Sequence, residues 1–498
     1  MALNPKKIYE DLKRKDINKL AAVDSLIFLI GNNDNIEIRR ASIKILQKIG
    51  IKNEKIFSLL EDLLVSDPNQ EIKEQAADCL KVLFQERALS PLKWTLDHES
   101  SWQFLLLIVS IIKEINNRKA KSIFIEKIKK FDNYKFIKSL SPLFKTEEIQ
   151  SFKTSELVEI INNHIVIKFF EDILEKVKFK IEKGVLIELD LSFISNNNFG
   201  WKILKTLSES IRVINKLTKL ELRGNRLGNL PNSIFSLPFL KFLDMSHNNL
   251  EKLSDRFDAL KSLEYLNLRY NNLTEIPNSV GSLENLKTLD LKHNRLTTLP
   301  ISFGDLISLE SLNLHGNQFT TIPSIIEKLT SLKKLKVGLN HLKNVPEWIK
   351  NLRSLKKLGL GGNKDLSKAE EWICFLPSIL ELNLYNNNIK ALPESIGSLE
   401  SLEVLILHNN HLTTLPESFG KLISLKKLDL SWNNITNLPE WISSLSSLEE
   451  LNLRGNKLSN LPESITSLHS LKVLNITLNK NIIQLPKELE NKALHIMK

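Results

Sequence analysis

The sequence has little cysteine, no long apolar run and no strong excess of either charge. Its two cysteines, Cys79 and Cys374, cannot form the several disulfide bridges that stabilise small secreted domains. The longest apolar run, Phe104–Ile112, is about half of the roughly 20 residues that a membrane-spanning helix needs. The first residues, MALNPKKIYEDLKRKD, lack the apolar core of a secretion signal. These absences predict a cytoplasmic protein that does not associate with membranes.

The net charge of +11 is spread along the chain. Lys and Arg outnumber Asp and Glu by 32 to 27 over residues 1–183 and by 37 to 31 over the remaining residues. Neither part has the concentrated positive charge that is typical of nucleic-acid-binding domains. Nucleic acid is therefore not the expected partner.

The sequence motifs of common catalytic and cofactor sites are also missing. The most glycine-rich segment, GLGGNK from Gly359, lacks the third glycine of a dinucleotide-binding loop and the Lys-Ser/Thr pair of a P-loop. No His-Glu-x-x-His, Cys-x-x-Cys or Gly-x-Ser-x-Gly sequence occurs. We therefore expect a protein that is not an enzyme and that has no cofactor and no metal site.

The sequence does contain a long internal repeat. From Leu217, the pattern L-x-x-L-x-L-x-x-N-x-L-x-x-L-P-x-x-I-x-x-L-x-x recurs twelve times, as in LESLNLHGNQFTTIPSIIEKLTS from Leu309. One unit cannot bury its own leucines at positions one, four and six, so the units must stack. Asparagine fills position nine throughout, where its amide can hydrogen-bond backbone groups that leave the sheet.

Two repeats depart from this pattern. The spacing is 23 residues except in the seventh repeat, where it is 24 and where the apolar Leu366 follows Asn363 by three places instead of two. Repeat twelve has the same slip, with Ile482 after Asn479. An extra residue in a regular ladder must bulge outward, so both turns should be locally irregular.

The repeats resemble the leucine-rich repeats of the plant Ras-group-related proteins, the animal Ras-pathway scaffolds and the scribble/erbin polarity proteins. The resemblance covers residues 217–493. It implies an α/β solenoid with a parallel β-sheet on its concave face, which binds other proteins. One longer unit comes first, with LIELDLS from Leu186 and an expected helix over Trp201–Ile214. This unit resembles a single ribonuclease-inhibitor-type repeat.

Residues 1–183 have the i, i+3, i+4 apolar spacing of helices. Two segments match at an offset of 34 residues, EIRRASIKIL from Glu37 and EIKEQAADCL from Glu71, and resemble a HEAT-type helical hairpin. An apolar stripe over Ile165–Lys183 predicts a helix that covers the first leucines of the solenoid, with a partner-binding helix as the alternative.

Together these patterns predict an α+β repeat protein with three parts. Residues 1–153 form an all-α, HEAT-like helical solenoid, and residues 154–183 form an amphipathic helical cap. Residues 184–498 form the leucine-rich-repeat domain, with one long repeat and twelve repeats of 23–24 residues.

Positions two, three, five, seven and eight of each repeat should face the concave side. Position two alternates Lys and Glu, which predicts a cross-strand charge ladder and no binding role. Exposed aromatic residues in the other columns, next to lysine-rich repeats six and seven, indicate a recognition surface. Gly338, Gly361 and Gly362 are expected to leave its floor open. The alternative is a solvated sheet with chance aromatics. The candidate partner-binding residues are Phe242, His247, Tyr265, Tyr270, His293, His315, Lys334, Lys336, Lys357, Tyr385, His408 and Trp432.

The functional prediction is a scaffold or adaptor whose concave face binds a protein with an acidic segment. The family resemblance points to small-GTPase-type signalling. A regulatory or targeting subunit of an enzyme such as a phosphatase is the alternative, and RNA binding is the least favoured.

Overall fold

A computed structural model describes residues 4–174, 177–194, 207–208, 210–479, 485–490 and 494–497. The chain divides into two compact units, Met1–Leu189 and Asp190–Lys498. Residues 201–206 and 209 of the helix expected over Trp201–Ile214, and the irregular turn expected at Ile482, lie outside the described residues.

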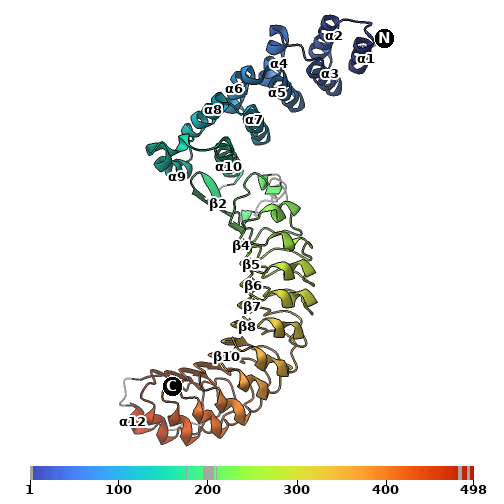
Figure 1. Cartoon of the computed structure of the whole chain (residues 1–498). Coiled ribbons are helices and arrows are strands. Elements are labelled where there is room, and N and C mark those ends of the chain that lie inside the picture. Colours follow the sequence, from blue (N-terminus) through green and yellow to red (C-terminus); the bar gives the residue numbers. More distant parts are fainter. Residues whose placement is uncertain are drawn as a thin grey trace. The chain divides into compact units, whose positions relative to one another are not determined.

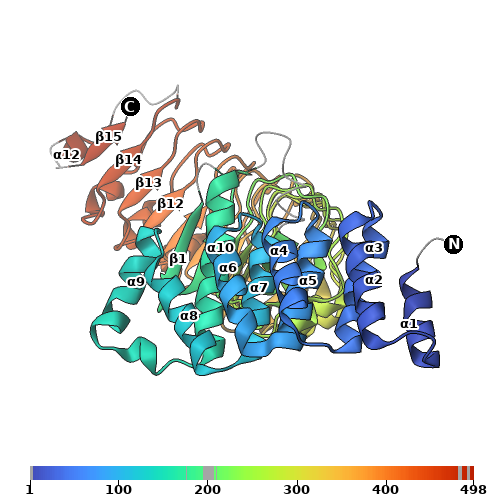
Figure 2. The same cartoon turned by 90° about the horizontal axis from the view of Figure 1, so that it is seen from above.

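The first unit consists of pairs of antiparallel helices, and successive pairs lie side by side (Figure 2). It ends in a β-hairpin. Its helices are α1 Pro5–Arg14, α2 Lys19–Asn32, α3 Ile36–Ile49, α4 Glu54–Ser66, α5 Gln70–Phe84, α6 Leu89–His98, α7 Trp102–Ile115, α8 Arg118–Lys129, α9 Tyr134–Lys145 and α10 Thr154–Ile173. The all-α prediction for the first part of the chain is confirmed.

Asparagine determines where most of these helices begin. A helix leaves its first backbone N–H groups without partners, and an Asn side chain before the first turn can accept hydrogen bonds from them. Seven helices start in this way, after Asn4, Asn18, Asn35, Asn53, Asn69, Asn117 and Asn133.

The helix predicted over Ile165–Lys183 is wrong in its second half. Helix α10 ends at Ile173, and the chain then forms the hairpin strands β1 Lys178–Glu182 and β2 Val185–Asp190. The two residues between these strands, Lys183 and Gly184, both have positive φ, as the tight hairpin turn requires. A Cβ at Gly184 would lie 2.7 Å from Leu140, so the close approach also selects glycine.

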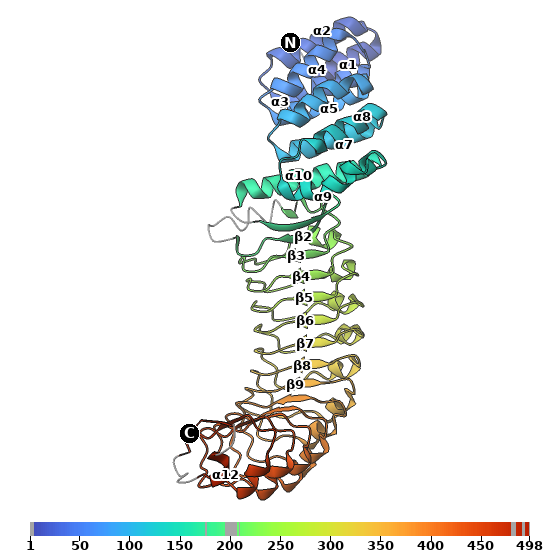
Figure 3. The same cartoon turned by 90° about the vertical axis from the view of Figure 1, so that its left-hand side faces the viewer.

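The second unit is a solenoid with one short strand in each repeat (Figures 1 and 3). All neighbouring strands from β3 to β15 pair in parallel, in the order of the sequence. The strands are β3 Lys219–Glu221, β4 Phe242–Asp244, β5 Tyr265–Asn267, β6 Thr288–Asp290, β7 Ser311–Asn313, β8 Lys334–Lys336, β9 Lys357–Gly359, β10 Glu381–Asn383, β11 Val404–Ile406, β12 Lys427–Asp429, β13 Glu450–Asn452, β14 Val473–Asn475 and β15 His495–Met497. The predicted repeat register is confirmed, because leucine at position four pairs with its equivalent, as Leu312 does with Leu335.

The convex side is formed by short 3-10 turns that start after the prolines. Pro300, for example, precedes the turn Ile301–Asp305. Repeat two has Ser254 in place of the proline, and its turn is the shorter Phe257–Ala259. Proline fixes φ of the extended residue that precedes each turn, −69° at Pro300, so it stiffens the return without removing a sheet hydrogen bond.

The asparagines at position nine are buried and connect adjacent repeats. The Asn317 amide nitrogen donates to the carbonyl oxygens of Leu291 and Leu314, each at 3.0 Å. Its Oδ1 atom accepts from the Leu296 N–H at 3.0 Å. The same three bonds recur in most repeats, and they satisfy backbone groups that would otherwise be buried without partners.

Repeat seven interrupts this ladder, as the extra residue predicts. The Leu366 N–H donates to the nearby Asn363 carbonyl oxygen at 2.9 Å. The Asn387 Oδ1 atom therefore accepts from the Asn363 N–H at 2.7 Å instead of from an N–H two residues further on.

Candidate functional site

The concave face changes direction at the end of each strand. In eight repeats an Asp or Asn at position five accepts a hydrogen bond from the N–H at position seven, as Asp290 does from Lys292 at 2.9 Å and Asn313 does from His315 at 3.2 Å. Position eight then has positive φ in all twelve repeats. These residues are Gly224, His247, Tyr270, His293, Gly316, Leu339, Gly362, Asn386, Asn409, Trp432, Gly455 and Leu478. Position eight is thus the left-handed residue of a repeated turn.

Large side chains at position eight raise the energy of this turn. Glycine adopts the left-handed conformation freely and asparagine tolerates it, whereas other L-residues are disfavoured by about 1–2 kcal/mol. His247, Tyr270, His293 and Trp432 nevertheless occupy it. Burial does not compensate fully, because Tyr270 is 40% and Trp432 is 46% exposed.

The rings of His247, Tyr270 and His293 pack against one another, and the ring of His315 extends them into one column of four. The His247 and Tyr270 ring centroids are 4.4 Å apart, those of Tyr270 and His293 are 4.6 Å apart, and those of His293 and His315 are 5.7 Å apart. We call these four residues the ring column. Phe242 and Tyr265, which are register partners on β4 and β5, stack separately with centroids 4.3 Å apart.

The histidines of the ring column are neutral at pH 7. Burial lowers the pKa of His247 and of His293, and nearby cationic groups lower both further. Burial, helped by Lys292, lowers the pKa of His315 to about 4. Each imidazole can therefore donate one hydrogen bond and accept one, while its faces stack on neighbouring rings.

The glycine floor is not open, which corrects the prediction. An added Cβ would lie 2.8 Å from the His315 ring at Gly338 and 2.1 Å from the Tyr385 ring at Gly361. At Gly362 it would lie 2.5 Å from the Leu339 side chain. These glycines are therefore required because neighbouring side chains already lie over them.

The three candidate lysines have different environments. The Lys357 ammonium lies 2.7 Å from Glu381, so its charge is already compensated. Lys334 and Lys336, on β8, have no ion-pair partner within the part of the chain that the structure describes. Burial and the Lys334 ammonium lower the pKa of Lys336. Uncompensated positive charge is therefore concentrated on β8.

Tyr385, His408 and Trp432 do not form a second column, since no ring contact joins them among the described residues. Tyr385 covers Gly361, and the His408 Nδ1 atom lies 2.7 Å from Ser431 Oγ. The Trp432 ring lies over Gly455, with the Arg454 guanidinium 5.9 Å from its centroid. The structure thus joins only part of the predicted surface.

Basic residues at position seven flank the ring column, and sequence reasoning missed them. Arg223 Nη2 lies 3.4 Å from His247 Nε2, and Lys292 Nζ lies 5.9 Å from the Tyr270 ring centroid. Lys292 immediately precedes the position-eight ring of His293, whereas Arg223 precedes Gly224 and lies one repeat before His247. A basic residue at position seven, beside or one repeat before a position-eight ring, is the signal that could have identified them.

The predicted charge ladder at position two is present. Glu264 pairs with Lys241 at 3.3 Å and with Lys287 at 2.8 Å, and Lys333 pairs with Glu310 at 2.8 Å. These charges compensate each other. An anionic partner would therefore gain most electrostatic attraction at β8.

Other chemistry is limited in the regions that the structure describes. Both cysteines are buried, and burial raises the pKa of Cys79 to about 12 and that of Cys374 to about 11. Thiols of this kind are poor nucleophiles at pH 7. No metal-binding group of His, Cys, Asp or Glu occurs among the described residues. None of the described helices has both the length and the apolar character needed to span a bilayer.

Comparisons with known proteins identify the repeats. Family models match residues 254–373 and 363–495 as a leucine-rich repeat region and residues 215–273 as a leucine rich repeat. A search of curated protein sequences gives no match.

Solved structures of other proteins are similar to this chain. An LRR protein of Leptospira interrogans is 30% identical, with 62% of this chain and 95% of that chain covered and a TM-score of 0.47. A TDR receptor is 28% identical, with 59% and 52% covered and a TM-score of 0.52. The PEPR1–AtPEP1 structure is 25% identical, with 68% and 54% covered and a TM-score of 0.50. This chain spans about half of the length of the latter two. Because the family models together span residues 215–495, more than half of the sequence, the chain belongs to the leucine-rich-repeat proteins.

Proposed function

We propose that this chain is a non-catalytic adaptor that binds a partner protein on the concave face of strands β4 to β8. The observation that carries the proposal is the ring column, which combines an unfavourable backbone conformation with exposed aromatic surface. Backbone strain of this kind clusters at binding sites, where the surrounding structure maintains it. Leucine-rich repeats commonly bind other proteins through their concave sheet.

The partner's chemistry follows from the two neighbouring features. The stacked rings leave Tyr270 40% exposed, and tyrosine is enriched in binding hot spots. Lys334 and Lys336 provide uncompensated positive charge two strands beyond β6. We therefore infer an acidic segment that also carries an aromatic or apolar residue. The Ras-scaffold resemblance transfers no partner-binding residue, so the proposal names a chemistry and not a pathway.

Replacing the rings with glycine tests this surface without breaking the turn. Tyr270→Gly with His293→Gly relieves about 1–2 kcal/mol of backbone strain at each site. It also removes stacking worth about 0.5–1.5 kcal/mol per pair. The melting temperature should therefore change little. Acidic, aromatic peptides selected on the wild-type chain from a displayed library should bind this variant at least about 30-fold more weakly.

Leu478→Gly is the matched control, because Leu478 has φ of 61° at the same position and is 52% exposed, far along the solenoid. It should retain full peptide affinity. Lys334→Glu with Lys336→Glu should slow association in a salt-sensitive way. Selected peptides that bind the double glycine variant as tightly as wild type would remove the ring column from the proposal.

A further inference from the structure

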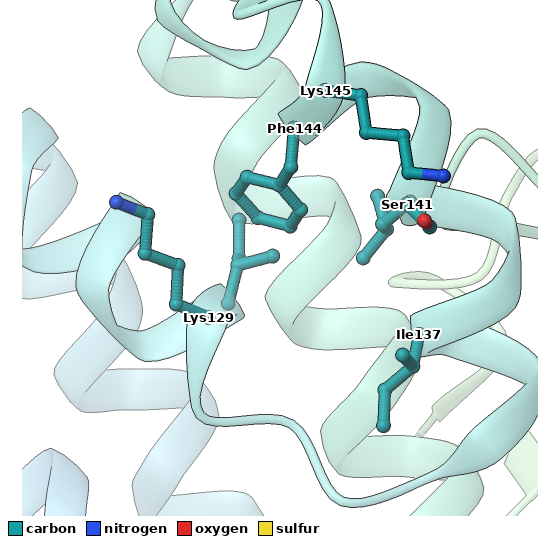
Figure 4. Close-up of a pocket in the computed structure, with 7 residues that line it drawn as sticks. Lys129, Ile137, Ser141, Phe144 and Lys145 are labelled. Carbon is teal, nitrogen blue, oxygen red and sulfur yellow. The ribbon is translucent and has the colours of Figure 1, made fainter.

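A second apolar surface lies in the first unit, on helices α8 and α9. A pocket of about 350 Å³ lies there, and Figure 4 shows Ile137 and Phe144 of α9 facing the end of α8. We call it the α8–α9 groove. Its lining residues are Ile128, Lys129, Ile137, Leu140, Ser141, Phe144 and Lys145.

Helix α9 has two apolar stripes, and only one of them is buried. Phe136, Leu140 and Leu143 are buried on its inner face. Tyr134, Ile137 and Phe144, at i, i+3 and i+10, form a second stripe, in which the small polar Ser141 occupies i+7. Tyr134 is 71% exposed and Ile137 is 46% exposed, whereas Ser141 and Phe144 are half-buried, so this stripe is open to solvent at its first half.

The charges around the groove differ from those of the preceding helices. There, lysines pair with acids two helices further along the chain, as Lys81 of α5 does with Glu114 of α7 at 2.6 Å and Lys93 of α6 does with Glu126 of α8 at 2.5 Å. Helix α9 contains no acidic residue. Within the described residues, no ion pair compensates Lys129, Lys138 or Lys145. Lys129 and Lys145 extend from opposite sides of the groove in Figure 4.

We propose that the α8–α9 groove binds an amphipathic helix of a partner protein, with an apolar stripe toward the groove and acidic residues on its flanks. The stripe from Tyr134 to Phe144 extends about 15 Å at 1.5 Å per residue, which matches roughly three turns of a bound helix. The lysines on both sides can pair with its carboxylates. Small-molecule sites enclose most of their ligand, whereas the exposed Ile137 leaves this groove open. The adaptor would then have one binding surface in each unit.

A labelled peptide can test the groove in the full-length chain. The probe is a helical peptide of about 16 residues, with leucines at i, i+3, i+4 and i+7 and glutamates on the flanks. Fluorescence anisotropy should show saturable binding that Ile137→Asp weakens at least about tenfold. Lys129→Glu with Lys145→Glu should weaken it as well, and a peptide with lysines in place of the glutamates should not bind.

Val82→Asp is the matched control, because Val82 on α5 is also 46% exposed but lies outside the groove. It should leave the affinity unchanged, and so should Tyr270→Gly, which separates this proposal from that for the concave face. Equal affinity for the acidic and basic peptides, or for Ile137→Asp and wild type, would overturn the proposal. Self-association that Ile137→Asp abolishes, without peptide binding, would assign the groove to a second copy of the chain instead.

Discussion

The two units hold their successive elements together in different ways. In the helical unit, exposed ion pairs connect neighbouring helical pairs, such as Arg40 with Glu71 and Lys81 with Glu114. In the repeat unit, most of the buried asparagines bond the backbone of both their own repeat and the adjacent one, as Asn317 does with Leu314 in its own repeat and with Leu291 and Leu296 in the preceding repeat. Exposed ion pairs are worth little, whereas unpaired buried polar groups are costly. The repeat unit therefore depends on a polar interior ladder, and the helical unit depends on its apolar faces.

The largest expected effect concerns a buried polar group in the helical unit. His164 stacks on Phe131 with ring centroids 3.7 Å apart, and burial lowers its pKa to about 4, against 6.5 for an ordinary histidine. Between pH 6.5 and 4 the unfolded chain gains a proton that the folded chain does not. Stability is therefore complete above pH 6.5 and falls by about 3 kcal/mol as the pH approaches 4.

Urea denaturation of the helical unit at pH 7.5, 5.5 and 4 measures this loss. His164→Phe preserves the aromatic packing and should remove that part of the pH dependence. The same decline in both proteins would show that His164 is not responsible.

The next effect tests the polar ladder of the repeat unit. Asn317→Ala leaves the Leu296 N–H and two carbonyl oxygens without their side-chain partner in a buried position. We expect a loss of about 2 kcal/mol in the free energy of unfolding. Chemical denaturation monitored within the repeat unit gives the value, and an unchanged midpoint would contradict the role assigned to position nine.

A smaller effect should distinguish repeat seven from its neighbours. The Leu366 N–H donates within its own turn, whereas the equivalent Ile389 N–H donates to Asn410 Oδ1 at 3.1 Å. The Leu366 N–H has a bond within its turn in place of the cross-repeat bond, and a difference of about 1 kcal/mol corresponds to roughly fivefold faster opening. Hydrogen exchange should therefore be faster at residues 364–368 than at residues 388–391. Equal rates would mean that the extra residue is accommodated without loosening the turn.

The smallest expected effects on the free energy of unfolding come from removing exposed ion pairs, and they should be equal in the two units. Glu264→Ala breaks two exposed ion pairs on the concave sheet, and Glu71→Ala breaks one between helices. Each should change the free energy of unfolding by about 0.5 kcal/mol or less. A loss above 1.5 kcal/mol in either variant would show that exposed pairs contribute more to that unit than we propose.

The binding surface was only partly predictable from the sequence. The repeat register places the ring residues at the ends of strands, and the structure joins His247, Tyr270, His293 and His315. Sequence reasoning expected three equivalent lysines, but Lys357 pairs with Glu381 on the adjacent strand. It also expected an open glycine floor, although His315, Tyr385 and Leu339 cover it. Both errors concern neighbours in space whose side-chain directions the repeat pattern does not specify.

The sequence by itself determined the solenoid, because leucines at positions one, four and six and asparagine at position nine have no stable arrangement other than stacking. It also determined most helix starts, since an N-cap asparagine acts locally. Only the tertiary structure decided that α10 ends at Ile173 and that Tyr270 adopts a left-handed conformation. Residue preferences oppose that conformation, and the hydrogen bonds of the adjacent repeats impose it: the Tyr270 N–H donates to the Lys292 carbonyl oxygen at 2.8 Å.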